Sequence, residues 1–269
     1  MRFTGRTVLI TGASSGIGAA LANRFAAEGA HLVLAARRRD KLEQVAAGLP
    51  TPHGEVRIVQ CDVTRDGEID DMVAELQRLG ATIDVVVANA GFGVAGALRS
   101  LTLDDYRRQI DTNVFGVLRT IYATLPALAR PGGQLAIIGS VAGHVPQAGA
   151  SAYAMSKFAI RALAEAIHVE LAPEGIVVTL ISPGFVDSDI RRTDNRGTVH
   201  EDVPDPVPAW LRMPVDRAAR EIVDAIHRRK RERIVTAHGR LIVWLYRHAP
   251  WLVRWVQRRG VSARREPHR

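Results

Sequence analysis

Short, nearly continuous apolar runs alternate with amphipathic stretches through the first 185 residues of this chain. Runs of this kind, rich in β-branched residues, are typical of strands that are buried on both faces, as in a parallel sheet. They cover residues 7–10, 31–36, 56–60, 83–88, 134–139 and 176–181. Strand–helix alternation predicts a doubly wound α/β fold with right-handed crossovers. We therefore expect a single-domain, Rossmann-like parallel sheet of about seven strands with helices on both faces, its last strand formed by residues 233–237 after a helix near 215–230.

The cysteine and histidine content narrows the kinds of site that the chain can hold. Cys61 is the only cysteine among 269 residues, which excludes an internal disulfide framework and fits a reducing compartment such as the cytoplasm. We interpret Cys61 as a small apolar strand residue. The nine histidines show no metal-ligand spacing, so no metal site is expected. No signal-peptide pattern precedes the first apolar run.

A glycine-rich turn, TGASSGIG (11–18), follows the first predicted strand and opens a helix predicted over 16–28. Glycines at this place let the backbone approach a pyrophosphate, and the helix N-terminus supplies free N–H groups. An ordinary strand-to-helix turn can carry similar glycines, but the place after the first strand favours a dinucleotide site. The predicted contacts are Gly12, Ser14, Ser15, Gly16, Ile17 and Gly18.

The end of the second predicted strand indicates which dinucleotide is bound. An acidic residue at this place accepts from the ribose 2′-hydroxyl of NAD, whereas arginine accommodates the 2′-phosphate of NADP. Here Arg37 and Arg38 follow the strand, and Asp40 comes too late to serve as the ribose acid. Alternatively, the two arginines could simply be solvent-exposed residues at the start of a helix. We favour the phosphate site and therefore expect NADP(H) to be favoured over NAD(H).

Seven motifs in a fixed order carry a resemblance to a known family. They are TGASSGIG, CDVT (61–64), ANAG (88–91), Asn113 in DTNVFG, Ser140 in IGSVAG, YAMSK (153–157) and SPGFV (182–186). Together they resemble the short-chain dehydrogenase/reductase family over about residues 5–240. The resemblance implies a dehydrogenase or reductase that transfers a hydride between nicotinamide and a carbonyl or secondary alcohol.

The resemblance also implies residue roles. Asp62 and Val63 would contact the adenine, and Asn89, Ala90 and Gly91 would form the wall beneath the adenosine ribose. The segment lining the nicotinamide would consist of Pro183, Gly184, Val186 and Ser188, where Ser188 replaces the family's usual threonine. The catalytic residues would be Asn113, Ser140, Tyr153 and Lys157, with Tyr153 and Lys157 also contacting the cofactor.

Tyr153 and Lys157 lie one helical turn apart, which indicates a proton donor with a cation beside it. A free tyrosine has a pKa of about 10, and a nearby ammonium favours the phenolate and lowers that pKa. Tyr153 would then act as general acid and base, Ser140 would hydrogen-bond the carbonyl oxygen, and Asn113 would hold a water that links Lys157 to solvent. The alternative is a catalytically idle NADP-binding sensor or partner-binding protein with a membrane-surface tail, for which the pairing of Tyr153 with Lys157 has no use.

The C-terminal part has a composition of its own. Residues 227–269 hold 13 Lys/Arg and two Asp/Glu, whereas residues 1–226 hold 23 and 26. We expect a Rossmann-fold domain over 1–238, with a substrate loop over 187–213, and a basic amphipathic extension over 239–269 that forms short helices at 239–248 and 251–259. Tryptophan and arginine on such helices suit a peripheral anchor at the inner face of a membrane. Packing on the same or another subunit is an equal alternative, and no nucleic-acid motif is present.

The sequence indicates a general class of substrate and a range of oligomeric states. Hydrophobic, basic extensions of this kind resemble those of family members that act on steroid-, retinoid- or acyl-like molecules, so we expect a small hydrophobic carbonyl or alcohol substrate. The family resemblance implies a homodimer or homotetramer built on the helices around 102–128 and 151–172.

Overall fold

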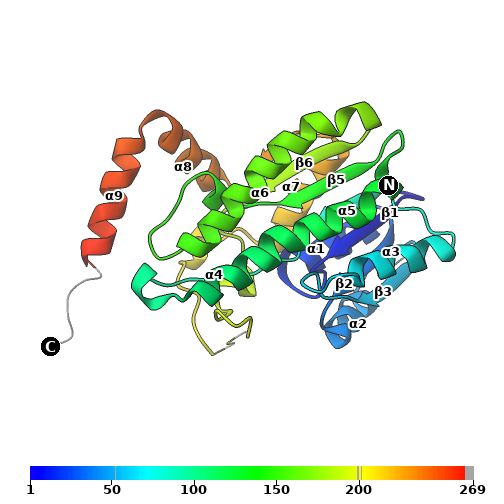
Figure 1. The fold of residues 1–269 in the computed structure, drawn as a ribbon, viewed down its shortest axis with the longest axis horizontal. Helices are drawn as coiled ribbons and strands as arrows, with labels where there is room; N and C mark the ends of the chain where they lie inside the picture. The colour runs from blue at the N-terminus through cyan, green and yellow to red at the C-terminus, as the bar shows by residue number, and fades with distance from the viewer. Residues whose placement is uncertain (52, 199, 201, 264–269) are drawn as a thin grey trace.

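The computed structural model describes residues 1–51, 53–198, 200 and 202–263 (Figure 1). Seven parallel strands form one sheet in the order β3-β2-β1-β4-β5-β6-β7. They are β1 (Thr7–Thr11), β2 (His31–Ala36), β3 (Val56–Gln60), β4 (Val85–Ala88), β5 (Gln134–Ile138), β6 (Val177–Ser182) and β7 (Glu232–Ile234). The predicted fold class is therefore confirmed.

Helices cover both faces of the sheet (Figure 1). Side chains of α1 (Gly16–Ala27), α2 (Arg39–Ala47) and α7 (Val215–His227) belong to one hydrophobic core. Side chains of α3 (Glu68–Arg78), α5 (Gly116–Leu128) and α6 (Ser151–Glu170) belong to a second core. Within β1, Val8 and Ile10 point into the first core while Leu9 points into the second, which explains why the strand sequences are apolar without alternation.

The order in which strands are added to the sheet reverses between β1 and β4, which lie side by side. From β1 the strand order proceeds outward to β2 and β3, whereas β4 begins the half that continues to β7. In open α/β sheets, ligands bind beyond the carboxyl ends of the strands at such a switch point. The fold thus places the glycine-rich turn after β1 beside the loop after β4.

The last strand is shorter than predicted, and the reason is a helix cap. We expected residues 233–237 to be extended, but β7 ends at Ile234. The hydroxyl of Thr236 accepts a hydrogen bond from the backbone N–H of Gly239 at 3.2 Å, so Thr236 starts α8 (Ala237–His248) instead of continuing the strand.

The predicted extension, 239–269, contains most of α8, which already begins at Ala237, and all of α9 (Pro250–Ala263); the two helices project from one end of the molecule (Figure 1). Among the described residues, no helix is long and apolar enough to cross a membrane. Residues 264–269 of the predicted extension, and residues 199 and 201 of the predicted substrate loop, lie outside the described residues.

Candidate active site

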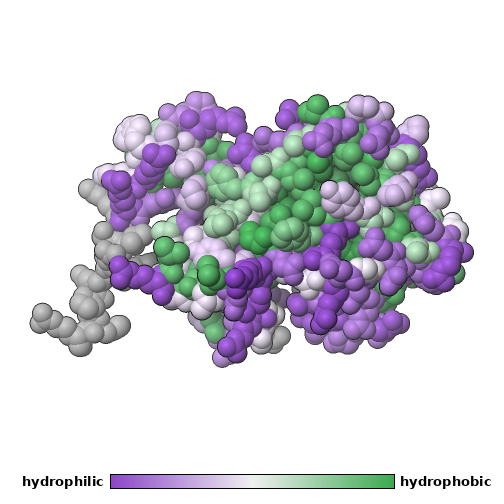
Figure 2. Space-filling model, viewed as in Figure 1, coloured by the Kyte–Doolittle hydropathy of each residue, from purple (hydrophilic) through white to green (hydrophobic). Residues whose placement is uncertain are grey.

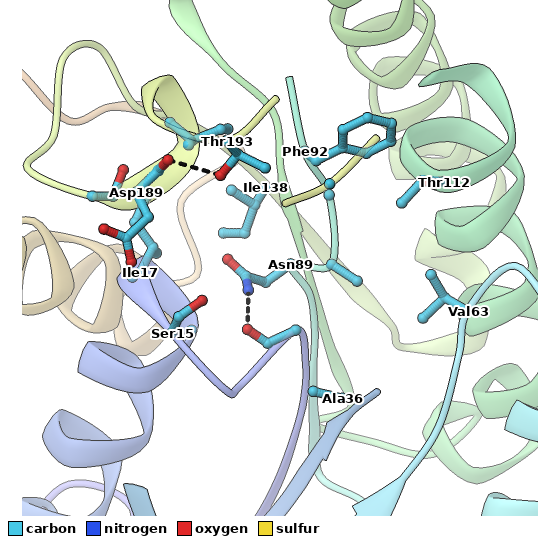
Figure 3. Close-up of a pocket in the computed structure, with 18 of the residues that line it drawn as sticks. Ser15, Ile17, Ala36, Val63, Asn89, Phe92, Thr112, Ile138, Asp189 and Thr193 are labelled. Carbon is cyan, nitrogen blue, oxygen red and sulfur yellow. Dashed lines mark hydrogen bonds between the residues drawn. The ribbon is translucent and has the colours of Figure 1, made fainter. Parts of the chain in front are cut away.

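One pocket of about 440 Å³ lies at the switch point and collects the predicted site residues. Figure 3 shows its wall, to which Ser15 and Ile17 come from the turn after β1, Asn89 from the end of β4 and Ile138 from the end of β5. All the predicted cofactor-binding residues line it, as do Ser140, Tyr153 and Lys157. Asn113 is the one predicted site residue that does not.

The glycine turn is shaped for close contact with the loop after β4. Gly12 has a φ of +67°, and a side-chain carbon there would lie 2.8 Å from the Cα of Ala90. Asn89 donates its amide N–H to the backbone oxygens of Thr11 at 3.0 Å and Gly12 at 3.2 Å. Ser15 precedes α1 without capping it by a side-chain hydrogen bond, so the first N–H groups of the helix are left for an anion. This cradle fits a dinucleotide pyrophosphate.

Replacing Gly18 should test how tightly this turn is packed. A side-chain carbon at Gly18 would lie 2.2 Å from the backbone oxygen of Gly12, which forces the turn apart. We expect Gly18→Ala to lower the melting temperature by several degrees and to weaken dinucleotide binding by about tenfold or more. Gly48→Ala is the matched control, because a carbon there meets its neighbours only at ordinary distances of 3.6 Å and 3.7 Å. Equal melting temperatures for the two variants would contradict the close packing of the turn.

Two arginines stand at the opening of the pocket beside β2. The Nη2 of Arg38 donates to the hydroxyl oxygens of Ser14 at 3.3 Å and Ser15 at 3.2 Å. Asp40 lies in the first turn of α2. No carboxylate among the described residues pairs with the guanidinium of Arg37 or Arg38. This end of the pocket therefore offers positive charge and hydroxyl groups, a combination that suits phosphate.

Ser140, Tyr153 and Lys157 meet at the other end of the pocket, beyond β5. Ser140 follows β5, and its Oγ accepts from the N–H of Ala142 at 3.1 Å. Tyr153 and Lys157 occupy successive turns of α6, with the Nζ of Lys157 5.7 Å from the centre of the Tyr153 ring. The buried ammonium of Lys157 donates to the backbone oxygen of Ile138 at 2.9 Å.

Burial controls the pKa values of this pair. Desolvation raises the pKa of Tyr153, and a hydrogen bond with Ser140 and the charge of Arg191 oppose this effect only in part. The expected downward shift of the Tyr153 pKa is thus wrong, because burial of the phenolate outweighs the hydrogen bond with Ser140 and the charge of Arg191. Burial also lowers the pKa of Lys157 to about 8.

Comparison with known proteins agrees with this geometry. The family model described as short chain dehydrogenase matches residues 6–198. The chain belongs to the short-chain dehydrogenase/reductase family. It is therefore an oxidoreductase, and the predicted family and enzyme class are confirmed.

Similar proteins include one with a known cofactor complex. An uncharacterized oxidoreductase of Staphylococcus aureus (strain MRSA252) is 36% identical over 193 residues, which are 71% of this chain and 83% of that protein. A short-chain dehydrogenase from Sphingobium yanoikuyae, solved in complex with NADPH, is 30% identical with a TM-score of 0.75 over 98% of each chain. A bulky-bulky ketone specific alcohol dehydrogenase from Comamonas testosteroni is 25% identical with a TM-score of 0.73, over 98% of this chain and 95% of that one.

In this dehydrogenase, Asn113 lies behind the pocket wall. It sits fully buried in a π-helical stretch, Asp111–Phe115, between α4 (Leu103–Ile110) and α5. Its Oδ1 accepts from the N–H of Phe92 at 3.1 Å, and its Nδ2 donates to the oxygens of Phe92 at 3.0 Å and Ser156 at 3.1 Å. Asn113 thus ties the loop after β4 to α6, and its water-holding role stays a prediction.

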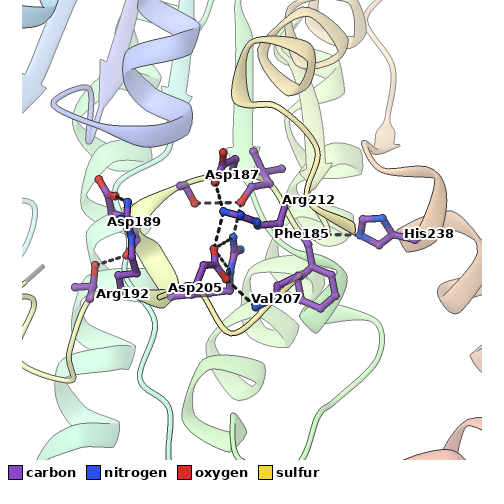
Figure 4. A network of polar contacts seen from close by, with 12 residues as sticks. Phe185, Asp187, Asp189, Arg192, Asp205, Val207, Arg212 and His238 are labelled. Atoms are coloured by element: carbon purple, nitrogen blue, oxygen red, sulfur yellow. Dashed lines mark hydrogen bonds and ion pairs between the residues drawn. The ribbon is translucent and has the colours of Figure 1, made fainter. Parts of the chain in front are cut away.

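Sequence reasoning missed Arg191, which lines the pocket from the segment after β6. Its Nη2 donates to Asp205 at 2.6 Å, and its guanidinium lies 6.0 Å from the Phe185 ring centre. The hydrogen bond from Arg191 lowers the pKa of Asp205 to about 2, and Arg212 pairs with Asp187 in the same network (Figure 4). Arg191 and Asp205 are 14 residues apart in a Pro-rich segment without periodicity, so no sequence signal joins them.

The first turn of α8 contacts the segment after β6, next to residues that line the pocket. The Nε2 of His238 in α8 accepts from the N–H of Phe185 at 3.1 Å, and the two rings stack at 5.4 Å (Figure 4). Burial lowers the pKa of His238, which favours the neutral ring that such an acceptor requires. Among the described residues, no group of three or more His, Cys, Asp or Glu could hold a metal ion.

Proposed function

We propose that this oxidoreductase is an NADP(H)-dependent carbonyl reductase or secondary-alcohol dehydrogenase. The observation that carries the proposal is the arrangement of one pocket, which has Ser140, Tyr153 and Lys157 at one end and Arg37 and Arg38 at the other. The two ends are separated by the glycine turn, which fits a pyrophosphate. When bound, the nicotinamide would supply or take up the hydride.

The residues of the chain handle the proton and the carbonyl oxygen. Tyr153 donates its phenolic proton to the oxygen during reduction and takes it back during oxidation. Ser140 donates a hydrogen bond to the same oxygen and stabilises the charge that develops there. Lys157 supplies a buried positive charge one turn away, which becomes most useful as Tyr153 loses its proton.

Cofactor preference is the direct test of this proposal. We expect purified protein to bind NADPH more tightly than NADH in a fluorescence titration. Combined Arg37→Ala and Arg38→Ala should weaken NADPH binding about a hundredfold and NADH binding little, because two charge-assisted contacts to the 2′-phosphate are lost. Arg39→Ala is the control, since Arg39 pairs with Glu43 instead.

Each outcome of the titration has a distinct meaning. NADH binding equal to or tighter than NADPH binding would overturn the cofactor preference and leave the dehydrogenase class intact. Binding of neither cofactor would support a non-catalytic function. The NADPH complex of the Sphingobium relative supports the expected result.

The substrate proposal is a hydrophobic ketone or its alcohol, of steroid-, retinoid- or acyl-like character. Apolar side chains of Phe92, Ile138 and Ile190 line the pocket near Tyr153. The specificity of the Comamonas relative for bulky-bulky ketones supports this class. The arginines at the tyrosine end do not demand an acidic substrate, because Arg108 and Arg191 are paired with Asp105 and Asp205.

We also propose that the dehydrogenase forms a homodimer or homotetramer through α4, α5 and α6. Figure 2 shows hydrophobic side chains gathered on the face that carries α5 and α6. Phe115, Tyr122 and Phe158 are exposed there. A face of this kind is typical of subunit contacts, and sedimentation at several concentrations would give the assembly size.

The extension is proposed to contact an anionic membrane surface. Leu241, Trp244 and Trp251 are exposed on α8 and α9, and Arg247 and Arg254 are exposed on the same helices. Large apolar side chains next to arginine suit the boundary between lipid headgroups and acyl chains.

Tryptophan substitution should separate this function from catalysis. We expect Trp244→Ala combined with Trp251→Ala to reduce partitioning onto vesicles of anionic phospholipid by about tenfold. Trp210→Ala is the control, because Trp210 is also exposed but lies in the segment after β6. Unchanged partitioning of the double variant would favour packing of the extension on a subunit.

A further inference from the structure

A tight turn in the segment after β6 reaches across the mouth of the pocket. The side-chain amide of Asn195 accepts from the N–H of Ala95 at 3.0 Å and donates to its carbonyl at 3.1 Å, so the turn is fastened to the loop after β4. On the other side, a side-chain carbon at Gly197 would lie 3.8 Å from the Nη2 of Arg37. Arg196 stands between these two anchors and lines the pocket.

Arg196 has no carboxylate partner in the described part of the chain. The nearest acid in sequence, Asp194, is already engaged: its Oδ1 accepts from the N–H groups of Arg196 and Thr198, and its Oδ2 contacts His200. The turn thus fixes the backbone of Arg196, and no carboxylate among the described residues occupies its guanidinium, which is therefore open to another anion.

The charge distribution on the pocket wall points the same way. Five arginines line the pocket, and Arg108 and Arg191 are paired with carboxylates. The carboxylates on the wall face other groups: Asp62 accepts from Thr64, Asp111 pairs with Arg119 and Asp189 pairs with Arg192. The arginines left without an acidic partner among the described residues are Arg37, Arg38 and Arg196.

We infer that Arg196 supplies a third guanidinium to the phosphate site formed by Arg37 and Arg38, so that a phosphate monoester on the cofactor fastens the segment after β6 over the pocket. The inference rests on the proposed NADP(H) function and extends it. Three guanidinium groups and the hydroxyls of Ser14 and Ser15 match the charge and the several oxygens of a phosphate dianion. The phosphate would then hold the segment after β6 over the pocket, although it binds at the opposite end of the pocket from Tyr153.

The test compares two nucleotides that differ only in the phosphate, adenosine 2′,5′-bisphosphate and 5′-AMP. We expect calorimetry on the full chain to show that Arg196→Gln weakens bisphosphate binding about tenfold and leaves 5′-AMP binding unchanged. Arg192→Gln is the matched control, because it removes the same charge from the same segment but Arg192 is paired with Asp189. Hydrogen exchange should show bisphosphate protecting the amides of residues 194–198 in the wild type and in Arg192→Gln, but not in Arg196→Gln.

The outcomes separate this inference from the proposed function. Wild-type binding that is equal for the two nucleotides overturns both. Discrimination that is lost on replacing Arg37 and Arg38 but kept in Arg196→Gln overturns this inference alone. Equal protection of residues 194–198 by inorganic phosphate would show that any anion suffices, and would overturn the link to the cofactor.

Discussion

Tyr153→Phe should reduce turnover by about a thousandfold or more while NADPH binding and the melting temperature stay close to those of the wild type. The phenolic oxygen is the only group removed, and it is the group proposed to exchange a proton with the substrate. Tyr122→Phe is the control, because Tyr122 is exposed on α5 away from the pocket. The measurement is steady-state turnover of an apolar ketone, with cofactor binding recorded separately. Wild-type turnover in Tyr153→Phe would remove the mechanism.

The pH dependence of the wild type should follow the raised pKa of Tyr153. Reduction needs the protonated phenol, and a raised pKa keeps the phenol protonated throughout the neutral range. Oxidation needs the phenolate, so it should increase as the pH rises toward that pKa. We therefore expect kcat/KM for oxidation to increase with pH through and above the neutral range, and kcat/KM for reduction to stay level over the neutral range, each pH profile being measured in its own direction.

Lys157→Met should make the folded protein more stable while it abolishes catalysis. Burial lowers the pKa of Lys157 from 10.5 to about 8, so the folded state carries this charge at a cost. Removing the charge should raise the free energy of unfolding at pH 7 by about 2 kcal/mol, after allowance for the lost hydrogen bond to the Ile138 oxygen. Lys41→Met, at an exposed position, should leave stability nearly unchanged.

The pH dependence of this gain has a definite sign. Between pH 8 and the ordinary pKa of 10.5, the unfolded chain binds more protons at residue 157 than the folded protein does. The contribution of Lys157 to the free energy of unfolding of the wild type therefore becomes more favourable as the pH rises across that window. The advantage of Lys157→Met should be full below pH 8 and should shrink above it. If Lys157→Met is less stable than the wild type at pH 7, burial of the Lys157 charge does not destabilise the folded protein, and this prediction is wrong.

The central strands were predictable because burial on both faces favours apolar residues at nearly every position. Val8, Leu9 and Ile10 illustrate this, since neighbours point into different cores. The glycine turn was equally readable, because Gly12 and Gly18 occupy places where a side-chain carbon would overlap the backbone. Such local constraints restrict the residue type at each position, so they can be recognised in the sequence.

Features that depend on contacts between residues far apart in the sequence could not be predicted in this way. The sequence could not indicate that burial would outweigh the charge near Tyr153, because desolvation depends on what covers the ring. Arg191 and Arg196 belong to an irregular segment whose course is fixed by pairs such as Arg191 with Asp205 and Asn195 with Ala95. Side-chain contacts across 14 and 100 residues follow no periodic pattern.

The bond between His238 and Phe185 decides where the chain can be shortened. α8 begins at Ala237, and His238 in its first turn holds the backbone N–H of Phe185, whose neighbours Gly184 and Val186 line the pocket. A stop codon placed before Ala237 would remove that acceptor, and the resulting loss of activity would reveal nothing about lipid. A stop codon after Ala249, between the two helices, would keep the acceptor and α8 and remove residues 250–269, which include α9.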